Sequence, residues 1–204
     1  MIIGIVMLAA GNSRRFGSNK LIYNVSGKPM YQHVLEKLQE TQDYVNQNMG
    51  GKIKVTLTVV TQFQEIIRYG EENKVQVLLN SQPDRGISSS LQIGLKANLN
   101  ADAVLFCVAD QPYITSESIR KFILEFAGSG KGMGCVAFGK TTGSPCIFRK
   151  KYYNELLKLQ GDRGGKKVLL SHMDDVLIYR VSEEKELMDI DYREGYAPHQ
   201  TDIP

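Results

Sequence analysis

Short unbroken apolar runs recur along the chain and predict buried β-strands, because a strand covered on both faces has no polar side. These runs cover residues 3–8, 53–60, 75–79, 103–108, 133–138, 176–181 and 187–190, the last two as a strand pair. Between them, apolar residues three and four positions apart predict helices, at residues 31–38, 63–69, 91–99, 116–126, 152–157 and 168–170. The alternation predicts an α/β fold on a parallel sheet, in which ligands gather at the carboxyl ends of the strands.

Glycine, proline and polar clusters predict where these elements end. Residues 41–52 are polar and include Gly50-Gly51, so we expect a loop or a frayed helix end there. Residues 139–143 predict a hairpin turn, and Pro145 predicts an edge strand or an irregular approach to the site.

Length and composition narrow the class of protein. A chain of 204 residues favours one α/β domain, residues 1–204, with a polar tail at 197–204 that we expect to be disordered. The net charge of +3, from 25 cations and 22 anions, is too balanced to indicate nucleic-acid binding. Because no apolar run approaches the roughly 20 residues that span a bilayer, we expect a soluble, cytoplasmic protein with no membrane partner.

The three cysteines lie in or beside apolar runs, at Cys107, Cys135 and Cys146. Their number is odd and no C-x-x-C spacing occurs, which favours buried, reduced thiols over a disulfide framework or a zinc site.

The loop after the first strand has the composition of a phosphate-binding site. The apolar run stops at Ala9-Ala10-Gly11 and gives way to a segment that carries Arg14, Arg15 and Lys20. Small residues allow backbone N–H groups to approach phosphate oxygens, and the three cations match the charge of a triphosphate. The spelling excludes two common phosphate loops, since neither G-x-x-x-x-G-K-S/T nor G-x-G-x-x-G is present.

Carboxylates lie near the ends of two predicted strands, the fourth (residues 103–108) and the last (residues 187–190). Asp110 comes directly after the apolar run 103–108, at the ligand edge of the sheet, where an anion needs a cation beside it. Magnesium suits this position, because it is held by one or two carboxylates together with substrate phosphates and water. Asp189 and Asp191 alternate and therefore share one face, so either is a candidate second ligand.

Two further loops are candidates for binding. After Gly86, a serine among residues 88–90 is expected to cap the following helix, and the hydroxyls there could also contact a nucleobase. The loop Gly161-Asp162-Arg163-Gly164, beside Lys166 and Lys167, is either a second anion site or a glycine helix end followed by a solvated basic turn.

The string L-A-A-G-x-S-x-R-F-G-x-x-K, residues 8–20, resembles the signature of the MobA-like nucleotidyltransferases, and the resemblance extends to residue 191. It implies a three-layer Rossmann-like fold with a mixed, mainly parallel sheet of the nucleotide-diphospho-sugar transferase (GT-A-like) type. It also implies catalytic roles for Arg14, Lys20 and Asp110. The nucleotide contacts it implies are Leu8, Ala9, Ala10, Gly11, Ser13, Arg14, Arg15, Phe16, Lys20 and Ser90.

The same resemblance assigns the metal, Mg²⁺, to the aspartate of a D-x-P motif, here Asp110-Gln111-Pro112. It places a second ligand near Asp191. The family's usual continuation, Thr-Pro-Glu-Asp, is replaced here by Tyr-Arg-Glu-Gly, which leaves the choice between Asp189 and Asp191 open, with Asp191 preferred.

Ser90, before Leu-Gln-Ile-Gly-Leu, resembles the serine that contacts cytosine in the cytidylyltransferases of isoprenoid synthesis. A G-x-P motif followed by G-D-x-G resembles the molybdenum cofactor cytidylyltransferase subgroup. The acceptor-binding residues that this implies are Gly143, Ser144, Pro145, Gly161, Asp162, Gly164 and Lys166.

The resemblance therefore implies transfer of CMP from CTP to the terminal phosphate of molybdopterin carrying molybdenum, with release of pyrophosphate. Three alternatives remain: a guanylyltransferase on the same acceptor, a sugar-1-phosphate nucleotidyltransferase, and a non-catalytic accessory protein that holds cofactor for a molybdenum hydroxylase. The expected partners are CTP and molybdopterin, together with a molybdenum hydroxylase apoenzyme or its chaperone.

Overall fold

The computed structural model describes residues 1–12 and 19–190 of the chain. Its centre is a seven-stranded sheet of order β5-β4-β1-β6-β8-β7-β9, in which only β8 runs opposite to its neighbours. The predicted mixed, mainly parallel α/β fold is therefore confirmed. The strands are β1 (Ile2–Ala9), β4 (Lys54–Thr61), β5 (Gln76–Leu79), β6 (Ala103–Val108), β7 (Met133–Phe138), β8 (Thr141–Arg149) and β9 (Val176–Arg180).

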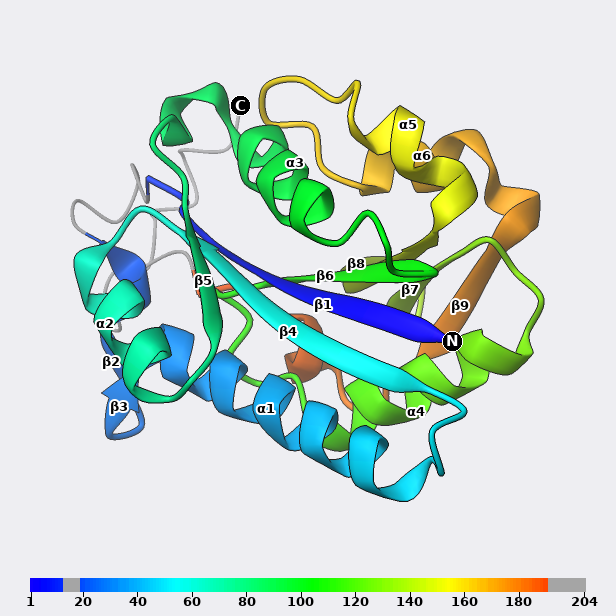
Figure 1. Ribbon diagram of the computed structural model, residues 1–204, viewed down its shortest axis with the longest axis horizontal. Helices are drawn as coiled ribbons and strands as arrows, with labels where there is room; N and C mark the ends of the chain where they lie inside the picture. The colour runs from blue at the N-terminus through cyan, green and yellow to red at the C-terminus, as the bar shows by residue number, and fades with distance from the viewer. Residues whose placement is uncertain (13–18, 191–204) are drawn as a thin grey trace.

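Helices cover both faces of this sheet and make three layers (Figure 1). One face carries α1 (Met30–Asn48), α2 (Gln64–Glu72) and α4 (Ser116–Gly128). The other carries α3 (Ile87–Ala97), α5 (Tyr153–Leu156) and α6 (Lys166–Ser171). A small hairpin of β2 (Asn24–Val25) and β3 (Lys28–Pro29) precedes α1.

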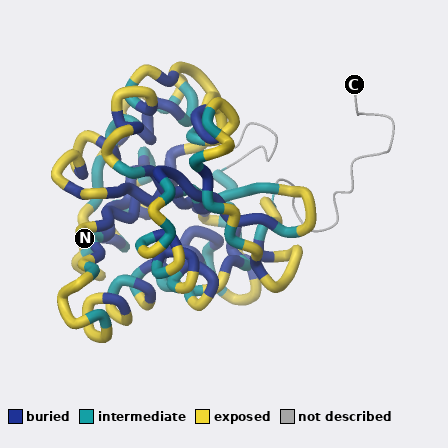
Figure 2. Tube along the Cα trace, turned by 90° about the vertical axis from the view of Figure 1, so that its right-hand side faces the viewer, coloured by how far each residue is buried: buried dark blue, intermediate teal, exposed yellow. Residues whose placement is uncertain are grey.

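Each helical layer forms its own hydrophobic core with the sheet, and the buried strands run between the two cores (Figure 2). The alternating side chains of β1 show the division. Ile3, Ile5 and Met7 join the core under α1 and α4, whereas Val6 and Leu8 join the core under α3. In the described part of the chain, no helix is both long and apolar enough to cross a bilayer.

Helix α1 continues to Asn48, so the loop or frayed end predicted for residues 41–52 is wrong over most of its length. Thr41 and Val45 extend the buried face of the helix beyond Leu38 at spacings of three and four. The Thr41 hydroxyl donates to the Lys37 carbonyl oxygen (2.8 Å), which satisfies a polar group inside the helix. Burial of this face outweighs the polar composition that suggested a loop.

The strand predicted at residues 187–190 is also wrong. Residues Glu184–Leu187 form a 3₁₀ turn, and Ile190 then donates its backbone N–H to the Asp110 carbonyl oxygen (3.1 Å). The turn is fixed by Glu186, which is 3% exposed and accepts hydrogen bonds from the backbone N–H and hydroxyl of Thr115. The segment therefore packs against the loop after β6 instead of joining the sheet.

Pro145 does not lie in an edge strand, because β8 pairs with β6 on one side and with β7 on the other. The alternative prediction, an irregular approach to the site, is confirmed. The β7–β8 register shifts between Cys135 and Val136, whose partners are Cys146 and Gly143, so Ser144 and Pro145 have no partner in β7. A bulge lets proline lie inside a sheet, since no ladder hydrogen bond is required of it.

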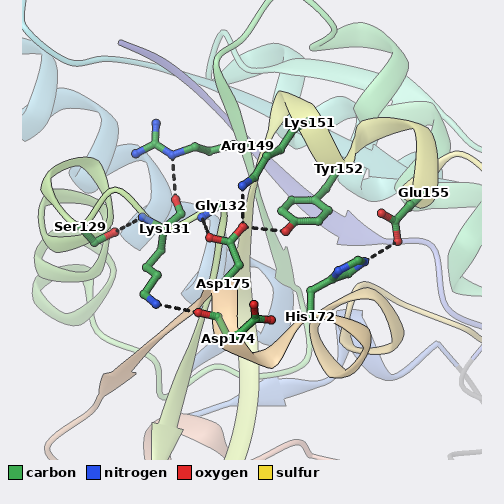
Figure 3. Close-up of polar contacts among 10 residues, drawn as sticks. All are labelled: Ser129, Lys131, Gly132, Arg149, Lys151, Tyr152, Glu155, His172, Asp174 and Asp175. Atoms are coloured by element: carbon green, nitrogen blue, oxygen red, sulfur yellow. Dashed lines mark hydrogen bonds and ion pairs between the residues drawn. The ribbon is translucent and has the colours of Figure 1, made fainter.

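The opposite end of the sheet from Asp110 is held by a polar cluster around Asp175 (Figure 3). The Asp175 carboxylate accepts hydrogen bonds from Lys151 Nζ (2.7 Å), the Tyr152 hydroxyl (2.6 Å) and the Gly132 backbone N–H (3.0 Å). The bonds from Lys151 and then Tyr152 lower the pKa of Asp175 to about 2. This carboxylate therefore links the starts of β7 and β9 to the segment that follows β8.

The low pKa predicts a pH-dependent contribution to stability. Because the folded-state pKa of Asp175 lies below its ordinary value of 3.8, the contribution is present above about pH 4 and is lost as the pH falls towards 2. We expect Asp175→Asn to lower the melting temperature at pH 7, and the difference from wild type to shrink between pH 4 and pH 2. Thermal unfolding at a series of pH values checks this, and two parallel curves would contradict it.

Candidate nucleotide-binding site

A cleft lies at the carboxyl ends of β1 and β6, the two central parallel strands. From β1 the chain proceeds towards β4 and β5, and from β6 it proceeds towards β7 and β9, so this is the topological switch point where such sheets bind ligands. The cavity has a volume of about 340 Å³. Its lining residues are Leu8, Ala10, Gly11, Asn12, Lys20, Leu21, Pro83, Asp84, Gly86, Ile87, Ser90, Val108, Ala109, Asp110 and Asp162.

The centre of the cleft is an ion pair between Lys20 Nζ and Asp110 Oδ2, 2.7 Å apart. Lys20 begins a 3₁₀ turn whose first residues are fixed by Asn19, the side chain of which accepts from the Leu21 N–H (3.1 Å). Asp110 follows Ala109, whose N–H donates to the Leu8 carbonyl oxygen (3.1 Å). Lys20 of the first loop is therefore the cation that the position of Asp110, after the fourth predicted strand, was expected to need. A cation and a carboxylate at one cavity wall can hold a phosphate and a metal ion at the same time.

Of the other nucleotide contacts predicted, Leu8, Ala10, Gly11 and Ser90 line the same cavity. Ala9 does not line it, since it is fully buried in β1 and its carbonyl oxygen accepts from the Thr61 hydroxyl (2.8 Å). The predictions for Ser13, Arg14, Arg15 and Phe16 lie outside the described residues and stay predictions.

A chain of hydrogen-bonded side chains that the sequence did not reveal joins two residues of the cleft wall, Asn12 and Asp84. Asn12 donates through Nδ2 to Asp84 Oδ1 (2.7 Å), and its own oxygen accepts from Gln62 Nε2 (2.8 Å). Gln62 also donates to the Ala10 carbonyl oxygen (2.9 Å). Gln62 directly follows β4. Because ligands gather at the carboxyl ends of parallel strands, this position alone could have marked Gln62 as a candidate site residue.

The helix after Gly86 begins without a serine cap, so the capping role predicted for one of residues 88–90 is wrong. Gly86 is itself the residue before the helix, and Ser88, Ser89 and Ser90 lie within the first turn of α3. Their hydroxyls make other bonds, because those of Ser88 and Ser89 donate back to the carbonyl oxygens of residues 85 and 86. The alternative role, a polar pocket at the helix start, is compatible with the position of Ser90 in the cavity wall.

Gly86 fixes the approach of two loops to the cleft. Its φ is +79°, and a Cβ there would lie 2.4 Å from the backbone carbon of Gly161 and 2.5 Å from Asp162 Oδ1. The Gly161 carbonyl oxygen also accepts from the Ser88 N–H (3.2 Å). The G-D-x-G loop is thereby held against the start of α3, with Asp162 at the cavity wall.

We expect Gly86→Ala to destabilise the fold by about 1–3 kcal/mol, because the positive φ and the close backbone both oppose a side chain. Urea unfolding measures the change. Gly128→Ala is the matched control, since nothing lies within 4 Å of its Cβ position, and it should not destabilise. If the two substitutions changed the free energy of unfolding equally, Gly86 would not be required for the close approach of the two loops.

A second, apolar cavity of about 170 Å³ adjoins the first and shares Leu8, Ile87 and Val108 with it. Four of the predicted acceptor-binding residues line it, namely Gly143, Ser144, Gly164 and Lys166. Asp162 lines the first cavity instead, Gly161 contacts Gly86, and Pro145 lines neither of the two.

Cys135 and Cys146 also line the second cavity, and burial raises the pKa of both thiols. Burial raises the pKa of Cys107 to about 12. All three thiols are free; Cys107 and Cys135 are buried as predicted, whereas Cys146 is partly exposed. Protonated thiols make this wall a neutral, polarisable surface.

The carboxylates of the cleft fit a hard divalent cation. Asp189 lies beside the Asp110 loop, because Gln111 donates through Nε2 to Asp189 Oδ1 (2.7 Å) and Ile190 bonds the Asp110 carbonyl oxygen. No group of three or more His, Cys, Asp or Glu side chains suited to a metal occurs among residues 1–12 and 19–190. Magnesium requires only one or two carboxylates beside substrate phosphates, and an oxygen-only donor set suits it. Asp191 lies outside the described residues, so the choice between Asp189 and Asp191 stays a prediction.

The architecture occurs in solved nucleotidyltransferase structures. A nucleotidyl transferase from Methanothermobacter thermautotroptrophicus superposes with a TM-score of 0.74 at 21% identity, over 93% of this chain and 92% of that one. The molybdopterin-guanine dinucleotide biosynthesis protein A of Archaeoglobus fulgidus gives a TM-score of 0.63 at 14% identity, over 93% and 92% of the two chains. This likeness shows that the chain has the α/β fold of these structures.

Sequence similarity to a known family of domains identifies the family of this chain. Residues 5–176 match the MobA-like NTP transferase domain, and the chain belongs to that family. A protein of Pyrococcus horikoshii named "Probable molybdenum cofactor guanylyltransferase" is 31% identical over 132 residues, 64% of this chain and 59% of that one. A "2-C-methyl-D-erythritol 4-phosphate cytidylyltransferase" of Dictyoglomus thermophilum is 30% identical over 127 residues, 60% of this chain and 50% of that one. The chain thus spans between half and two thirds of the length of these relatives.

Proposed function

We propose that this protein is a nucleotidyltransferase that moves CMP from CTP to the terminal phosphate of molybdopterin carrying molybdenum, releasing pyrophosphate. The observation that carries the proposal is the contact of Lys20 with Asp110 inside the cleft at the end of β1 and β6. A nucleoside triphosphate needs both a cation for its phosphates and an acid for its metal, and this cleft supplies the two side by side.

The roles of the residues follow from their charges. Lys20 donates to phosphate oxygens and stabilises the negative charge that accumulates during in-line displacement at the α-phosphorus. Asp110, with Asp189 or Asp191, would hold Mg²⁺, which when bound neutralises phosphate charge. A phosphate monoester, with a second pKa of about 6, is already a dianion at neutral pH, so the acceptor needs no general base. This agrees with the absence of histidine from the residues that line the described cleft.

A manganese complex of the fold neighbour Rv0371c from Mycobacterium tuberculosis H37Rv has been solved, with a TM-score of 0.66 at 17% identity. That complex supports the choice of a hard divalent ion for this fold. The relatives divide over the base, since some are named guanylyltransferases and others cytidylyltransferases. Ser90 lies at the cavity wall, and its resemblance to the serine that contacts cytosine in the cytidylyltransferases of isoprenoid synthesis supports cytosine.

The adjoining apolar cavity supports a flat, partly apolar acceptor such as a pterin. Its wall is formed by aromatic, aliphatic and cysteine side chains, with Lys166 as a cation at the edge. The shared residues Leu8, Ile87 and Val108 place this cavity next to the nucleotide cleft, as group transfer between the two ligands requires.

The test is a transfer assay with CTP, GTP, ATP and UTP, each labelled at the α-phosphate, with Mg²⁺ and molybdopterin carrying molybdenum. We expect a labelled dinucleotide from CTP and pyrophosphate release only when the acceptor is present. Preference for GTP would contradict the choice of base, and turnover with a sugar-1-phosphate would contradict the choice of acceptor. Binding of CTP and cofactor without any pyrophosphate release would show an accessory protein instead.

A further inference from the structure

Asn80 is a buried polar residue that the proposed mechanism leaves unused. It follows the last residue of β5, is 1% exposed, and its backbone N–H donates to the Thr61 carbonyl oxygen (2.7 Å). Its side chain joins the turn after β5 to the first turn of α3, which carries Ser90 at the cavity wall.

The orientation of the Asn80 amide is fixed by its partners. Its Oδ1 accepts from the backbone N–H of Gln82 (2.9 Å), which can only donate. The Nδ2 group therefore faces the serines, and donates to Ser89 Oγ and to Ser90 Oγ at 2.9 Å each. A flipped amide would place Nδ2 against the Gln82 N–H and lose that bond, so the Gln82 N–H sets the direction of the amide.

The same arrangement fixes the direction of both hydroxyl groups. Ser89 accepts from Asn80 and donates its own hydrogen to the Gly86 carbonyl oxygen (2.8 Å). Ser90 also accepts from Asn80, but its hydroxyl donates no hydrogen bond within the described part of the chain. Since Ser90 lines the cleft, its O–H can donate to a ligand there.

We infer that Asn80 makes Ser90 a hydrogen-bond donor towards the cleft and so selects a nucleobase that presents an unprotonated acceptor. This inference rests on the proposed function. On its Watson–Crick edge cytosine offers two adjacent acceptors, O2 and N3, whereas guanine presents two donors there, N1–H and the 2-amino group, beside the single acceptor O6. Asn80 is thus a positioning residue that acts through Ser90, and the donor direction favours the pyrimidine.

Asn80→Asp reverses the direction of the hydrogen bond between residue 80 and the Ser90 hydroxyl, with little change in the shape of the side chain. The Gln82 N–H and the Ser90 hydroxyl, which can rotate to donate to residue 80, favour the ionised carboxylate. Ser90 then donates to residue 80 and turns its lone pairs to the cleft. We expect the KM for CTP to rise at least tenfold at pH 8 with kcat changed less than threefold, and Ser90→Ala to have a similar effect.

A double-mutant cycle separates this role from a structural one. If Asn80 acts through Ser90, Asn80→Asp changes the KM for CTP less than twofold when Ser90 is already alanine. Ser89→Ala is the matched control, because it removes the other hydroxyl bound to Asn80, which does not line the cleft, and it should leave the KM unchanged. Full additivity of Asn80→Asp and Ser90→Ala, or an equal effect of Ser89→Ala, would overturn the inference.

The wild-type protein gives an independent test if Asn80→Asp does not fold. We expect 3-deaza-CTP or 2-thio-CTP, which lack or weaken one cytosine acceptor, to show a KM at least tenfold above that of CTP. Ser90→Ala should abolish the difference. Equal KM values of wild type for all three nucleotides would overturn the inference, whereas failure of wild type to transfer any nucleotide would overturn the proposed function instead.

Discussion

Substitution of Lys20 by methionine should reduce kcat for CMP transfer by about 10²–10³-fold, the usual cost of removing one donor to a developing anion. Methionine keeps most of the side-chain length and removes the charge. The side chain of Lys20 is 12% exposed and lies at the cavity wall, so water cannot readily replace its ammonium group. Steady-state kinetics with Mg²⁺, CTP and molybdopterin carrying molybdenum measure the effect.

The matched control is Lys121→Met on α4, far along the chain and outside the cleft. Lys121 is 60% exposed and pairs with Glu117 one turn away, a contact that contributes little to stability. This variant should retain wild-type kcat and KM. A Lys20→Met protein with kcat within threefold of wild type and an unchanged melting temperature would show that Lys20 does not act in transfer.

Substitution of Asp110 by asparagine should reduce kcat by about 10²-fold or more and weaken Mn²⁺ binding by about 10–100-fold. Asparagine matches the aspartate in shape but lacks the negative charge that a hard cation requires. The Asp110 side chain is 24% exposed, so loss of its ion pair with Lys20 should cost less than about 1 kcal/mol of stability. Calorimetric titration with Mn²⁺ and the transfer assay measure the two effects separately.

Asp43→Asn, at an exposed position of α1, is the control for Asp110 and should bind Mn²⁺ as wild type does. Unchanged Mn²⁺ affinity in Asp110→Asn, together with normal transfer, would show that this carboxylate holds no metal.

The strands that the sequence predicted correctly are those whose side chains are buried on both faces of the sheet. The runs 103–108 and 133–138 agree with β6 and β7 at both ends, because continuous apolar residues have no other stable environment. The meeting of Lys20 and Asp110 was predictable for the same reason. Each follows a central buried strand, and parallel strands end at one edge of the sheet.

The failures occurred where tertiary contacts outweigh local pattern. Residues 187–190 have the composition of a strand, yet the buried Glu186 and the bond from Ile190 to the Asp110 carbonyl oxygen hold them against a loop. For Pro145 only the edge-strand alternative was wrong, because a bulge admits the proline between β6 and β7. The segments that these residues contact, the loop at Asp110 and the strands beside Pro145, were not identifiable from the neighbouring sequence alone.

The polar network of the cleft was the least predictable part of the site. Asn12, Gln62, Asp84 and Asn80 are ordinary loop residues in sequence, and their roles follow only from hydrogen bonds between segments far apart in the chain. Their positions after β1, β4 and β5 were the available signal, because each comes within five residues of the end of a parallel strand.

The most direct test of the account is a crystal structure of the protein with Mn²⁺ and α,β-methylene-CTP, with the metal located by its anomalous scattering. We expect a manganese peak in contact with the Asp110 carboxylate, the triphosphate within hydrogen-bond distance of Lys20 Nζ, and the cytosine beside Ser90. A nucleotide bound outside this cleft, or manganese in contact with neither Asp110 nor the phosphates, would contradict it.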